Sequence, residues 1–331
     1  MSDSDIPIET WIRALPKAER HLHLEGGLPW ALLCEACPDK YNEPPASWAK
    51  DFRFESFSHF ESELLGYAAD YYTSAERYHT CAKAVFAEKQ ASNVRYLETS
   101  IASGVLDFFE LDAYDVIAAI RDAVPDGLEV RLFLGIHHSG YSERMKPVID
   151  RLIENDALDG IDLHGAEDEP LGDWAPHLWE RAREHGKMTK AHAGEMLGAE
   201  FVDYAIQELK AERIQHGGRA AEKDQTVDQL RTNGIALDLC PISNVKLGMA
   251  KDMASHPIRQ LVDAGICCTL NTDDPLSFGN RLEDEYLALH DEAGFSKEEL
   301  AQLARNGFYQ ALAPKEWVHT QLQEIDKTIA V

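Results

Sequence analysis

Short β-prone runs recur along the chain, and a longer stretch with helical spacing of apolar residues follows each run. Most neighbouring runs are separated by roughly 25 to 35 residues, the length of one strand with its crossover helix. Amphipathic helices are predicted between them, for example over Pro176–His185 and Glu222–Thr232. The runs are Arg20–Glu25, Val94–Ser100, Val130–His137, Ile161–His164, Met188–Ala193, Arg213–His216, Ile235–Cys240 and Cys267–Asp273.

Eight repeated β-then-α units predict an α/β fold of the closed, TIM-type (β/α)8 class. One gap breaks the rhythm, because about 65 residues separate the first two runs, which is too many for a single crossover. We therefore predict one domain over residues 1–331, with residues 26–92 as a helical insertion over the barrel mouth. The aromatic residues at helical spacing in this insertion are expected in helix cores: Phe57, Phe60, Tyr67, Tyr71 and Tyr72.

The chain has 58 acidic and 32 basic residues, a formal charge of −26. Because this charge repels phosphate backbones and anionic lipids, we expect neither a nucleic-acid nor a membrane partner. The N-terminal sequence lacks a basic segment followed by an apolar one, and no run approaches membrane-spanning length. Six scattered cysteines indicate a reducing compartment, so we expect a cytoplasmic protein.

Histidine and aspartate residues suited to metal-dependent hydrolysis lie at the ends of the predicted strands, where barrel active sites are built. His21 and His23 form an H-x-H motif, and strand alternation puts both side chains on one face. His192 lies at the end of the fifth run, and Asp273 ends the eighth. Three imidazoles and a carboxylate form a donor set that suits zinc, with room for a water. His216 ends the sixth run and would lie near that water.

Six segments resemble the adenosine deaminase family of the amidohydrolase superfamily. They occur in family order between residues 16 and 278, and therefore cover most of the chain. The segments are PKAERHLHLEGGL, GIDLHGAEDE, KAHAGE, RIQHGG, LCPISN and LNTDDPLSF. The resemblance implies a hydrolase that removes the 6-amino group of a small-molecule purine and releases ammonia.

The resemblance also implies a role for each candidate residue. His21, His23, His192 and Asp273 would hold one Zn2+ per chain together with its water, and His216 would orient that water and assist its deprotonation. The catalytic set implied in this way contains His216 and Asp273 together with a glutamate of the KAHAGE segment.

That glutamate, Glu195, would protonate the purine ring at N1, which requires a neutral carboxylic acid at working pH. Asp274 would share a hydrogen bond with N7, and the backbone N–H of Gly165 would meet N3. Residues expected to orient these groups are Arg213, Ser243 and Asn244. Three strand-end histidines could contact substrate, but we expect them to pack behind the site instead: His137, His138 and His164.

The sequence departs from the family pattern at three places. Adenosine-specific members tend to carry Asp at the fifth position of H-x-H-x-D, where it meets the ribose, whereas this chain has Glu25. A glutamate there is also seen in members that act on free adenine or on 6-aminodeoxyfutalosine. Glu98 is followed by Thr99 and Ser100, where relatives often place an arginine. The GIHHSG segment matches no pattern that assigns it a role.

The leading hypothesis is a deaminase of adenosine or a related nucleoside, with adenine and 6-aminodeoxyfutalosine as the alternatives. A metal hydrolase of pterins, cyclic amides or esters is disfavoured, because Glu195 with Asp273 and Asp274 serves a purine ring. An AMP deaminase is disfavoured because no basic cluster is present for a phosphate. A catalytically silent metal-binding barrel would have lost a ligand or the general acid, and none is missing. The sequence carries no signal for an oligomeric state.

Overall fold

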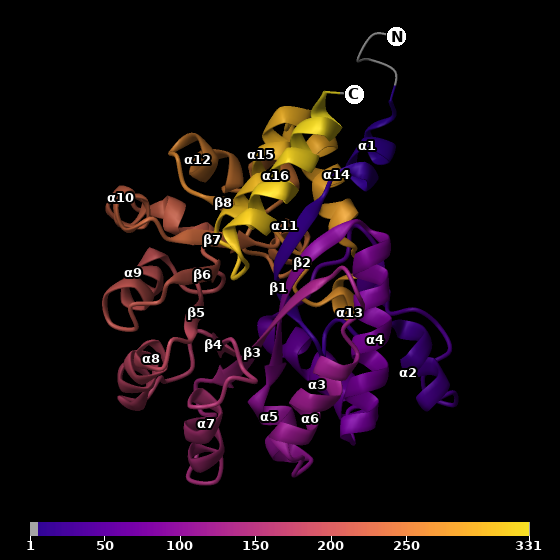
Figure 1. Cartoon of the computed structure of the whole chain (residues 1–331), viewed down its shortest axis with the longest axis vertical. Helices are drawn as coiled ribbons and strands as arrows, with labels where there is room; N and C mark the ends of the chain where they lie inside the picture. Colours follow the sequence, from indigo (N-terminus) through magenta and orange to yellow (C-terminus); the bar gives the residue numbers. More distant parts are fainter. Residues whose placement is uncertain (1–5, 331) are drawn as a thin grey trace.

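Residues 6–330 are described by the computed structural model, and they form one parallel sheet of eight strands surrounded by helices (Figure 1). The strands are β1 Lys17–His23, β2 Val94–Ala102, β3 Glu129–His137, β4 Gly160–His164, β5 Met188–Ala193, β6 Arg213–His216, β7 Ala236–Leu239 and β8 Cys268–Leu270. They neighbour one another in chain order from β1 to β8. The predicted α/β fold, a TIM-type (β/α)8 barrel, is confirmed.

The sheet closes where the segment after β8 meets β1. The backbone N–H of Asp273 donates to the carbonyl of His21, and the N–H of His23 donates to the carbonyl of Asp273, both at 3.1 Å. One position lower, the Arg20 N–H donates to the Asn271 side-chain oxygen at 2.7 Å. Candidate ligands from the first and last strands therefore take part in closing the barrel.

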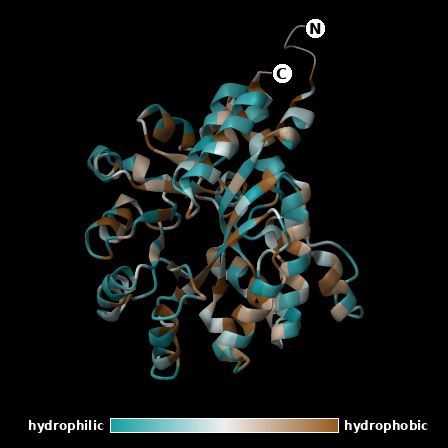
Figure 2. Cartoon of the chain, viewed as in Figure 1, coloured by the Kyte–Doolittle hydropathy of each residue, from teal (hydrophilic) through white to brown (hydrophobic). Residues whose placement is uncertain are grey.

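Helices follow the strands along the chain and cover the outside of the barrel. The α-helices are α1 Ile8–Ala14, α2 Trp30–Ala36, α3 Phe57–Tyr71, α4 Ala75–Ala91, α5 Ser103–Phe108, α6 Ala113–Asp122, α7 Lys146–Ile153, α8 Trp174–Glu184, α9 Ala199–Gln207, α10 Asp224–Asn233, α11 Pro241–Lys246, α12 Ile258–Asp263, α13 Pro275–Phe278, α14 Leu282–Ala293, α15 Lys297–Tyr309 and α16 Lys315–Ile329. Short 3-10 helices are η1 Ala46–Trp48, η2 Gly218–Glu222 and η3 Met253–Ser255. Hydrophobic and hydrophilic residues are mixed along most helices (Figure 2), as helices with one buried face require.

Three predicted strands end earlier than expected, and β7 does so by only one residue, stopping at Leu239. β1 stops at His23, where its pairing with β2 ends, so Glu25 lies in the following turn. β8 stops at Leu270, and Asp273 beyond it has a φ of 66°, which is incompatible with extended backbone. The helices predicted between runs are present as α8 and α10, with small shifts at their ends.

Residues 26–92 contain helices with two kinds of packing. α4 packs against β2 and α6, as the outer helices of a barrel do. By contrast, α3 and η1 pack against α13, which follows β8 at the carboxyl end of the barrel. The α3 segment is therefore the part of this region that reaches the barrel mouth.

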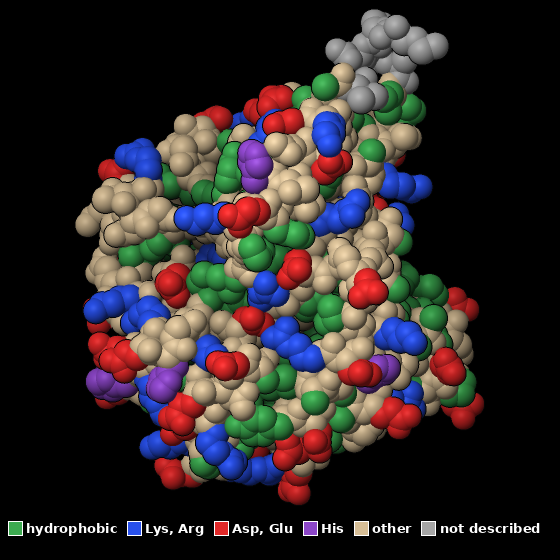
Figure 3. Space-filling model, in the orientation of Figure 1, with side chains coloured by type: hydrophobic (Ala, Val, Ile, Leu, Met, Phe, Trp, Pro, Cys, Tyr) green, Lys and Arg blue, Asp and Glu red, His purple; other side chains and the backbone are tan. Residues whose placement is uncertain are grey.

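The surface is charged, but its charges are interspersed. Figure 3 shows acidic, basic and hydrophobic side chains alternating over the visible face. Within residues 6–330, no helix combines the length and the apolar character needed to cross a membrane.

The barrel interior contains a layer of charged side chains, which we call the ionic layer and define as Arg20, Glu98, Lys190, Arg213 and Asp238. All five are buried. Glu98 Oε2 accepts from Arg213 and from Lys190 at 2.6 Å each, and Asp238 Oδ1 accepts from Arg20 Nε at 3.0 Å. Arg213 also approaches Asp238 at 3.7 Å. Each carboxylate of the layer thus faces at least two cations.

Candidate active site

The predicted metal ligands converge at the carboxyl end of the barrel. His192 Nε2 lies 3.0 Å from His21 Nε2 and 3.2 Å from His23 Nε2. Asp273 Oδ1 lies 3.2 Å from the Nε2 atoms of both His21 and His23. Ligands 2.0–2.1 Å from a common ion in tetrahedral geometry are about 3.3 Å apart, so these four separations fit a shared ion. His21 and His23 themselves do not fall in one group of mutually close donor atoms.

The hydrogen bonds of the imidazoles identify which nitrogens face the cluster. His21 Nδ1–H donates to the Asp238 carbonyl at 3.1 Å, and His192 Nδ1–H donates to the Leu163 carbonyl at 2.8 Å. In the neutral rings both Nε2 atoms then carry lone pairs. Two lone pairs 3.0 Å apart repel each other unless a cation lies between them. The local chemistry therefore fits a metal ion at this position.

Donor atoms around this position form overlapping groups rather than one isolated set. His192 and Asp273 link the groups, and the structure adds His216, His164 and Asp274 as neighbours of the predicted ligands. The groups whose donor atoms lie within 4.8 Å of one another are His21 with His192, His216 and Asp273; His23 with His164 and His192; and His23 with Asp273 and Asp274.

His216 and Asp273 both have left-handed backbones, with φ of 60° and 66°. Such conformations are costly for residues other than glycine and persist where the surrounding structure enforces them. The Ser243 hydroxyl donates to Asp273 Oδ2 at 2.6 Å, and the Asn244 amide lies 3.1 Å from His216 Nδ1. These contacts place Ser243 and Asn244 where the sequence predicted them to orient site groups. Burial holds the pKa of His216 well below its usual value, so the ring is neutral.

Glu195 projects into the same pocket from the loop after β5. Its Oε1 is 3.4 Å from His216 Nε2, and this oxygen is buried without a hydrogen-bond partner among the described residues. Burial, and then the negative charges of Asp273 and Glu167, raise the pKa of Glu195 well above its usual value. The raised pKa favours the protonated carboxyl group, which is the form that a proton donor requires.

Asp274 and Gly165 face the same cavity. Asp274 Oδ1 is buried without a hydrogen-bond partner in the described structure, and burial raises the pKa of this carboxyl well above its usual value. A side chain on Gly26 would meet this oxygen at 1.7 Å, so only glycine fits beneath it. Gly165 has a φ of 94°, and a Cβ there would lie 3.0 Å from His137. Both positions therefore depend on close backbone approach.

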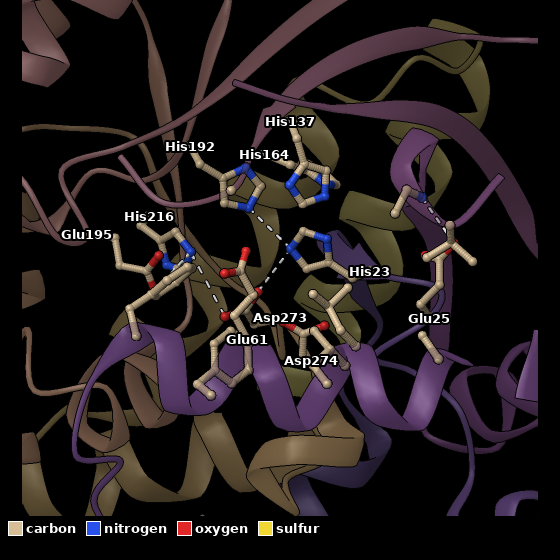
Figure 4. A pocket seen from close by; sticks show the side chains of 18 residues that line it. His23, Glu25, Glu61, His137, His164, His192, Glu195, His216, Asp273 and Asp274 are labelled. Carbon is tan, nitrogen blue, oxygen red and sulfur yellow. Dashed lines mark hydrogen bonds and ion pairs between the residues drawn. The ribbon is translucent and has the colours of Figure 1, made fainter. Parts of the chain in front are cut away.

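The pocket is closed on one side by α3, which contributes Phe57, Phe60 and Glu61 to its lining. Figure 4 shows this helix passing across the pocket that the histidines and aspartates line. Phe60 lies in an apolar cluster with Phe54 and Phe278, and Phe57 packs against it, as expected for helix core; both residues also line the pocket. The expectation of helix core also holds for three others, which are buried away from the pocket lining: Tyr67, Tyr71 and Tyr72.

Glu25 lies at the opposite side of the pocket from Glu195, with His23 and Asp273 between them (Figure 4). Its Oε1 accepts from the Tyr78 hydroxyl at 2.7 Å and from the Ala102 N–H at 3.0 Å. Burial raises the pKa of Glu25, while these two donors oppose the shift. The carboxylate is held firmly in place at this end of the pocket.

The remaining predicted residues divide between the pocket and its surroundings. His137 and His164 line the pocket, and burial lowers the pKa of His137 to about 4, so that ring is neutral. His138 instead donates to the Glu169 carbonyl at 2.8 Å. Arg213 belongs to the ionic layer and does not line the pocket.

Sequence reasoning missed two carboxylates that contact the site. Asp162 Oδ1 lies 3.2 Å from His192 Nδ1, and Glu167 accepts hydrogen bonds from the loop that carries Glu195. Both residues lie inside the GIDLHGAEDE segment, so their position was marked but their partners were not visible. The partners of these two carboxylates lie on β5 and on the loop after it. That they are close can be known only once the sheet order is known, because β4 pairs with β5.

Comparison with known proteins agrees with this arrangement. The chain is 31% identical over 317 residues to an adenine deaminase of Ectopseudomonas mendocina, covering 92% of this chain and 99% of the relative. A crystal structure of adenine deaminase from Arthrobacter aurescens superposes with a TM-score of 0.85 at 25% identity, covering 96% of this chain and 100% of that one. A zinc-bound amidohydrolase from Burkholderia ambifaria shares the fold, with a TM-score of 0.82 at 22% identity over 99% and 97% of the two chains.

The adenosine deaminase family model matches residues 16–328, nearly the whole chain. This match spans Glu195, the Asp273–Asp274 pair and the five histidines that line one pocket with them: His23, His137, His164, His192 and His216. The chain therefore belongs to the adenosine deaminase family of hydrolytic purine deaminases.

Proposed function

We propose that this protein is a zinc-dependent adenine deaminase, which hydrolyses the 6-amino group of the free base to a 6-oxopurine and ammonia. The observation that carries this proposal is the fixed carboxylate of Glu25 at the pocket end opposite Glu195. The relatives that match over nearly their full length and bear the name adenine deaminase support it.

Zinc is the proposed ion because three imidazole nitrogens and one carboxylate oxygen match its preferred ligands. The similar amidohydrolase with bound zinc supports the same choice. Zinc bound there lowers the pKa of a coordinated water toward neutrality. The proposed ligands are His21, His23, His192 and Asp273.

The side chains of this chain supply the proton transfers and the orientation. Glu195, whose raised pKa favours the protonated form, donates its proton to N1 as water oxygen adds to C6. Asp274, also protonated, donates a hydrogen bond to N7, and the Gly165 N–H donates to N3. His216 orients the water from the side of the pocket next to Glu195. His216 accepts the proton that the water loses and passes it to the 6-amino group, the C6–N bond breaks, and ammonia leaves while the 6-hydroxyl returns a proton to Glu195.

Whether the substrate is the free base or a nucleoside depends on the space left around Glu25. With N1 at Glu195 and C6 at the metal, N9 points toward the Glu25 end of the pocket. The Glu25 carboxylate is longer by one methylene than the aspartate of adenosine-specific members, and Tyr78 with Ala102 prevents it from swinging away. We infer that it occupies space that a ribose would need.

A nucleoside is the second candidate substrate, because a larger cavity adjoins the pocket. The two cavities share five lining residues, and the outer one has a volume of about 670 Å3. The shared residues are Glu61, Leu65, Ala68, Val105 and His137. A substituent on N9 that passed Glu25 would find room there.

Ammonia release across a purine panel tests the proposal. The panel contains adenine, adenosine, 2′-deoxyadenosine, methylthioadenosine and aminodeoxyfutalosine, with Glu195→Gln and His192→Ala assayed alongside for activity and metal content. We expect the highest kcat/KM with adenine, and we expect Glu25→Asp to raise kcat/KM for adenosine relative to adenine. A higher kcat/KM with a nucleoside in the wild type would replace adenine as substrate. No turnover with the metal bound would leave a catalytically silent barrel.

A further inference from the structure

We propose that Glu167 is a positioning residue for Glu195: its carboxylate anchors the loop that carries the general acid, and His138 holds the Glu167 loop in register. This inference rests on the proposed role of Glu195 in purine deamination. It also gives the GIHHSG segment, which matches no family pattern, a defined task through His138.

The Glu167 carboxylate accepts hydrogen bonds from three consecutive backbone N–H groups of one loop. Its Oε1 accepts from the backbone N–H of Glu195 at 2.9 Å, and its Oε2 accepts from Met196 at 3.0 Å and from Leu197. Glu167 is buried, and within residues 6–330 it forms no ion pair with a cation. Three backbone N–H groups from one short loop therefore bind this carboxyl group and fix the position of that loop, although burial still raises the pKa of Glu167.

The anchored loop is short and confined at both ends. It leaves β5 through Gly194, which has a φ of 76° and where a Cβ would lie 2.6 Å from Val202. It enters α9 at Ala199. Only four residues lie between, and Glu167 binds the backbone of three of them. A side chain that leaves such a backbone has little freedom, so Glu195 is aimed at the pocket.

His138 contacts both the loop after β4, which carries Glu167, and α9, which follows the loop that carries Glu195. Its Nδ1–H donates to the carbonyl of Glu169 at 2.8 Å, two residues beyond Glu167. Its ring packs against Phe201 of α9, with 5.8 Å between the ring centroids. His138 is 2% exposed, so these contacts are shielded from water. The loop after β4 and the helix after β5 are thus held at a fixed separation.

A double-mutant cycle tests the inference, with adenine deamination as the readout and Glu167→Gln, Glu195→Gln and the double variant as the set. Glu195→Gln should lower kcat by about 10²- to 10⁴-fold, as loss of a general acid does. Glu167→Gln should lower kcat by about 10²-fold with KM little changed, because a displaced catalytic group costs that much. If Glu167 acts through Glu195, the double variant should be no slower than Glu195→Gln.

The matched control is Asp168→Asn, which removes an exposed charge on the neighbouring residue and should leave kcat unchanged. Multiplicative losses in the double variant would overturn the proposal, and so would an unchanged kcat in Glu167→Gln. Glu167→Asp keeps the charge but has a shorter reach, so its kcat should fall between those of wild type and Glu167→Gln even if the amide variant folds poorly.

Amide hydrogen exchange separates this inference from the proposed function. The N–H groups of residues 195–197 should exchange slowly in the wild type and faster in Glu167→Gln, whatever the substrate proves to be. Absence of ammonia release in the wild type would contradict the proposed function alone. Equal exchange rates in both proteins would contradict the anchoring by Glu167.

Discussion

The ionic layer and the pocket above it are both buried, yet the carboxyl groups of the two regions differ in their partners. In the layer, Glu98 and Asp238 each face two or more cations. In the pocket, Glu195 Oε1 and Asp274 Oδ1 have no hydrogen-bond partner within the described chain. A buried polar atom without a partner costs free energy, so it persists where a ligand completes it. Among the buried carboxyl groups, hydrogen-bond partners therefore distinguish the layer from the pocket, although Arg20 Nη1 and Arg213 Nε of the layer also lack a partner among the described residues.

Glu195→Gln should give the largest loss of activity, and it should do so without affecting the stability that the ionic layer provides. Because the glutamine cannot donate the proton to N1, kcat for adenine should fall by about 10²- to 10⁴-fold. The raised pKa of Glu195 favours its neutral form, which the amide resembles, so the free energy of unfolding should stay close to that of wild type. Steady-state kinetics and urea unfolding on the same preparation check both parts; a large loss of stability would break the comparison.

Glu98→Gln should produce the reverse pattern. Removal of this carboxylate leaves the charges of Arg213 and Lys190 buried without their shared partner. We expect the free energy of unfolding to fall by about 3–5 kcal/mol, because breaking one side of a buried ion pair is that costly. Denaturant unfolding measures the loss. A variant as stable as wild type would show that the layer does not support the barrel.

The pH dependence of stability should carry the signature of the same residue. Although burial alone would raise the pKa of Glu98, Arg213 and Lys190 outweigh it and lower the pKa to about 2 from 4.5. A carboxylate with a depressed pKa contributes stability that is complete above pH 4.5 and is lost as the pH falls toward 2. Urea midpoints between pH 5 and pH 2.5 should therefore drop more steeply in wild type than in Glu98→Gln.

Gly26→Ala should disturb the pocket alone and by a smaller amount. The added methyl would lie 1.7 Å from Asp274 Oδ1, so Asp274 must move away from its position. A displaced binding group should lower kcat/KM for adenine by about tenfold to a hundredfold. Gly66→Ala is the matched control, because its added methyl meets no atom within 4 Å.

Asp228→Asn provides the exposed counterpart of the ionic layer and the smallest expected effect. Asp228 and Arg231 form an i,i+3 pair on α10 with side chains 63% and 54% exposed. Pairs of this kind contribute under about 1 kcal/mol, so the free energy of unfolding should change by less than that. A loss comparable with that of Glu98→Gln would show that burial is not what distinguishes the two pairs.

Much of the fold follows from the sequence, because eight apolar runs at nearly constant spacing leave few other topologies. The errors occur where local backbone geometry overrides pattern. Asp273 is part of a β-prone run, but its left-handed backbone ends β8 before it. The spacing of apolar residues could not separate α4, which packs on β2, from α3, which reaches the pocket, because both helices need one apolar face.

The sequence predicts the residues that line the candidate site, but not the residues that hold them in position. The strand-end histidines and Glu195 stand out by residue type at positions where barrels place chemistry. The anchoring contacts of Glu167 and the lock on Glu25 by Tyr78 join residues far apart in sequence. Nothing about a lone glutamate or tyrosine marks such a partner, since either residue could equally lie on the surface.

A metal ion bound where β8 meets β1 would also stabilise the closed barrel. Arg20 and Asn271, which help to close the barrel there, are 251 positions apart in the sequence. An ion held by His21, His23 and Asp273 would therefore act as a cross-link between the two ends of the chain. A cross-link over a loop of this length is worth on the order of 5 kcal/mol in unfolded-chain entropy. The ion that activates water would thus also hold β1 and the segment after β8 together. Removal of the ion by a chelator would loosen the contact between β1 and β8 before the contact between any other two neighbouring strands.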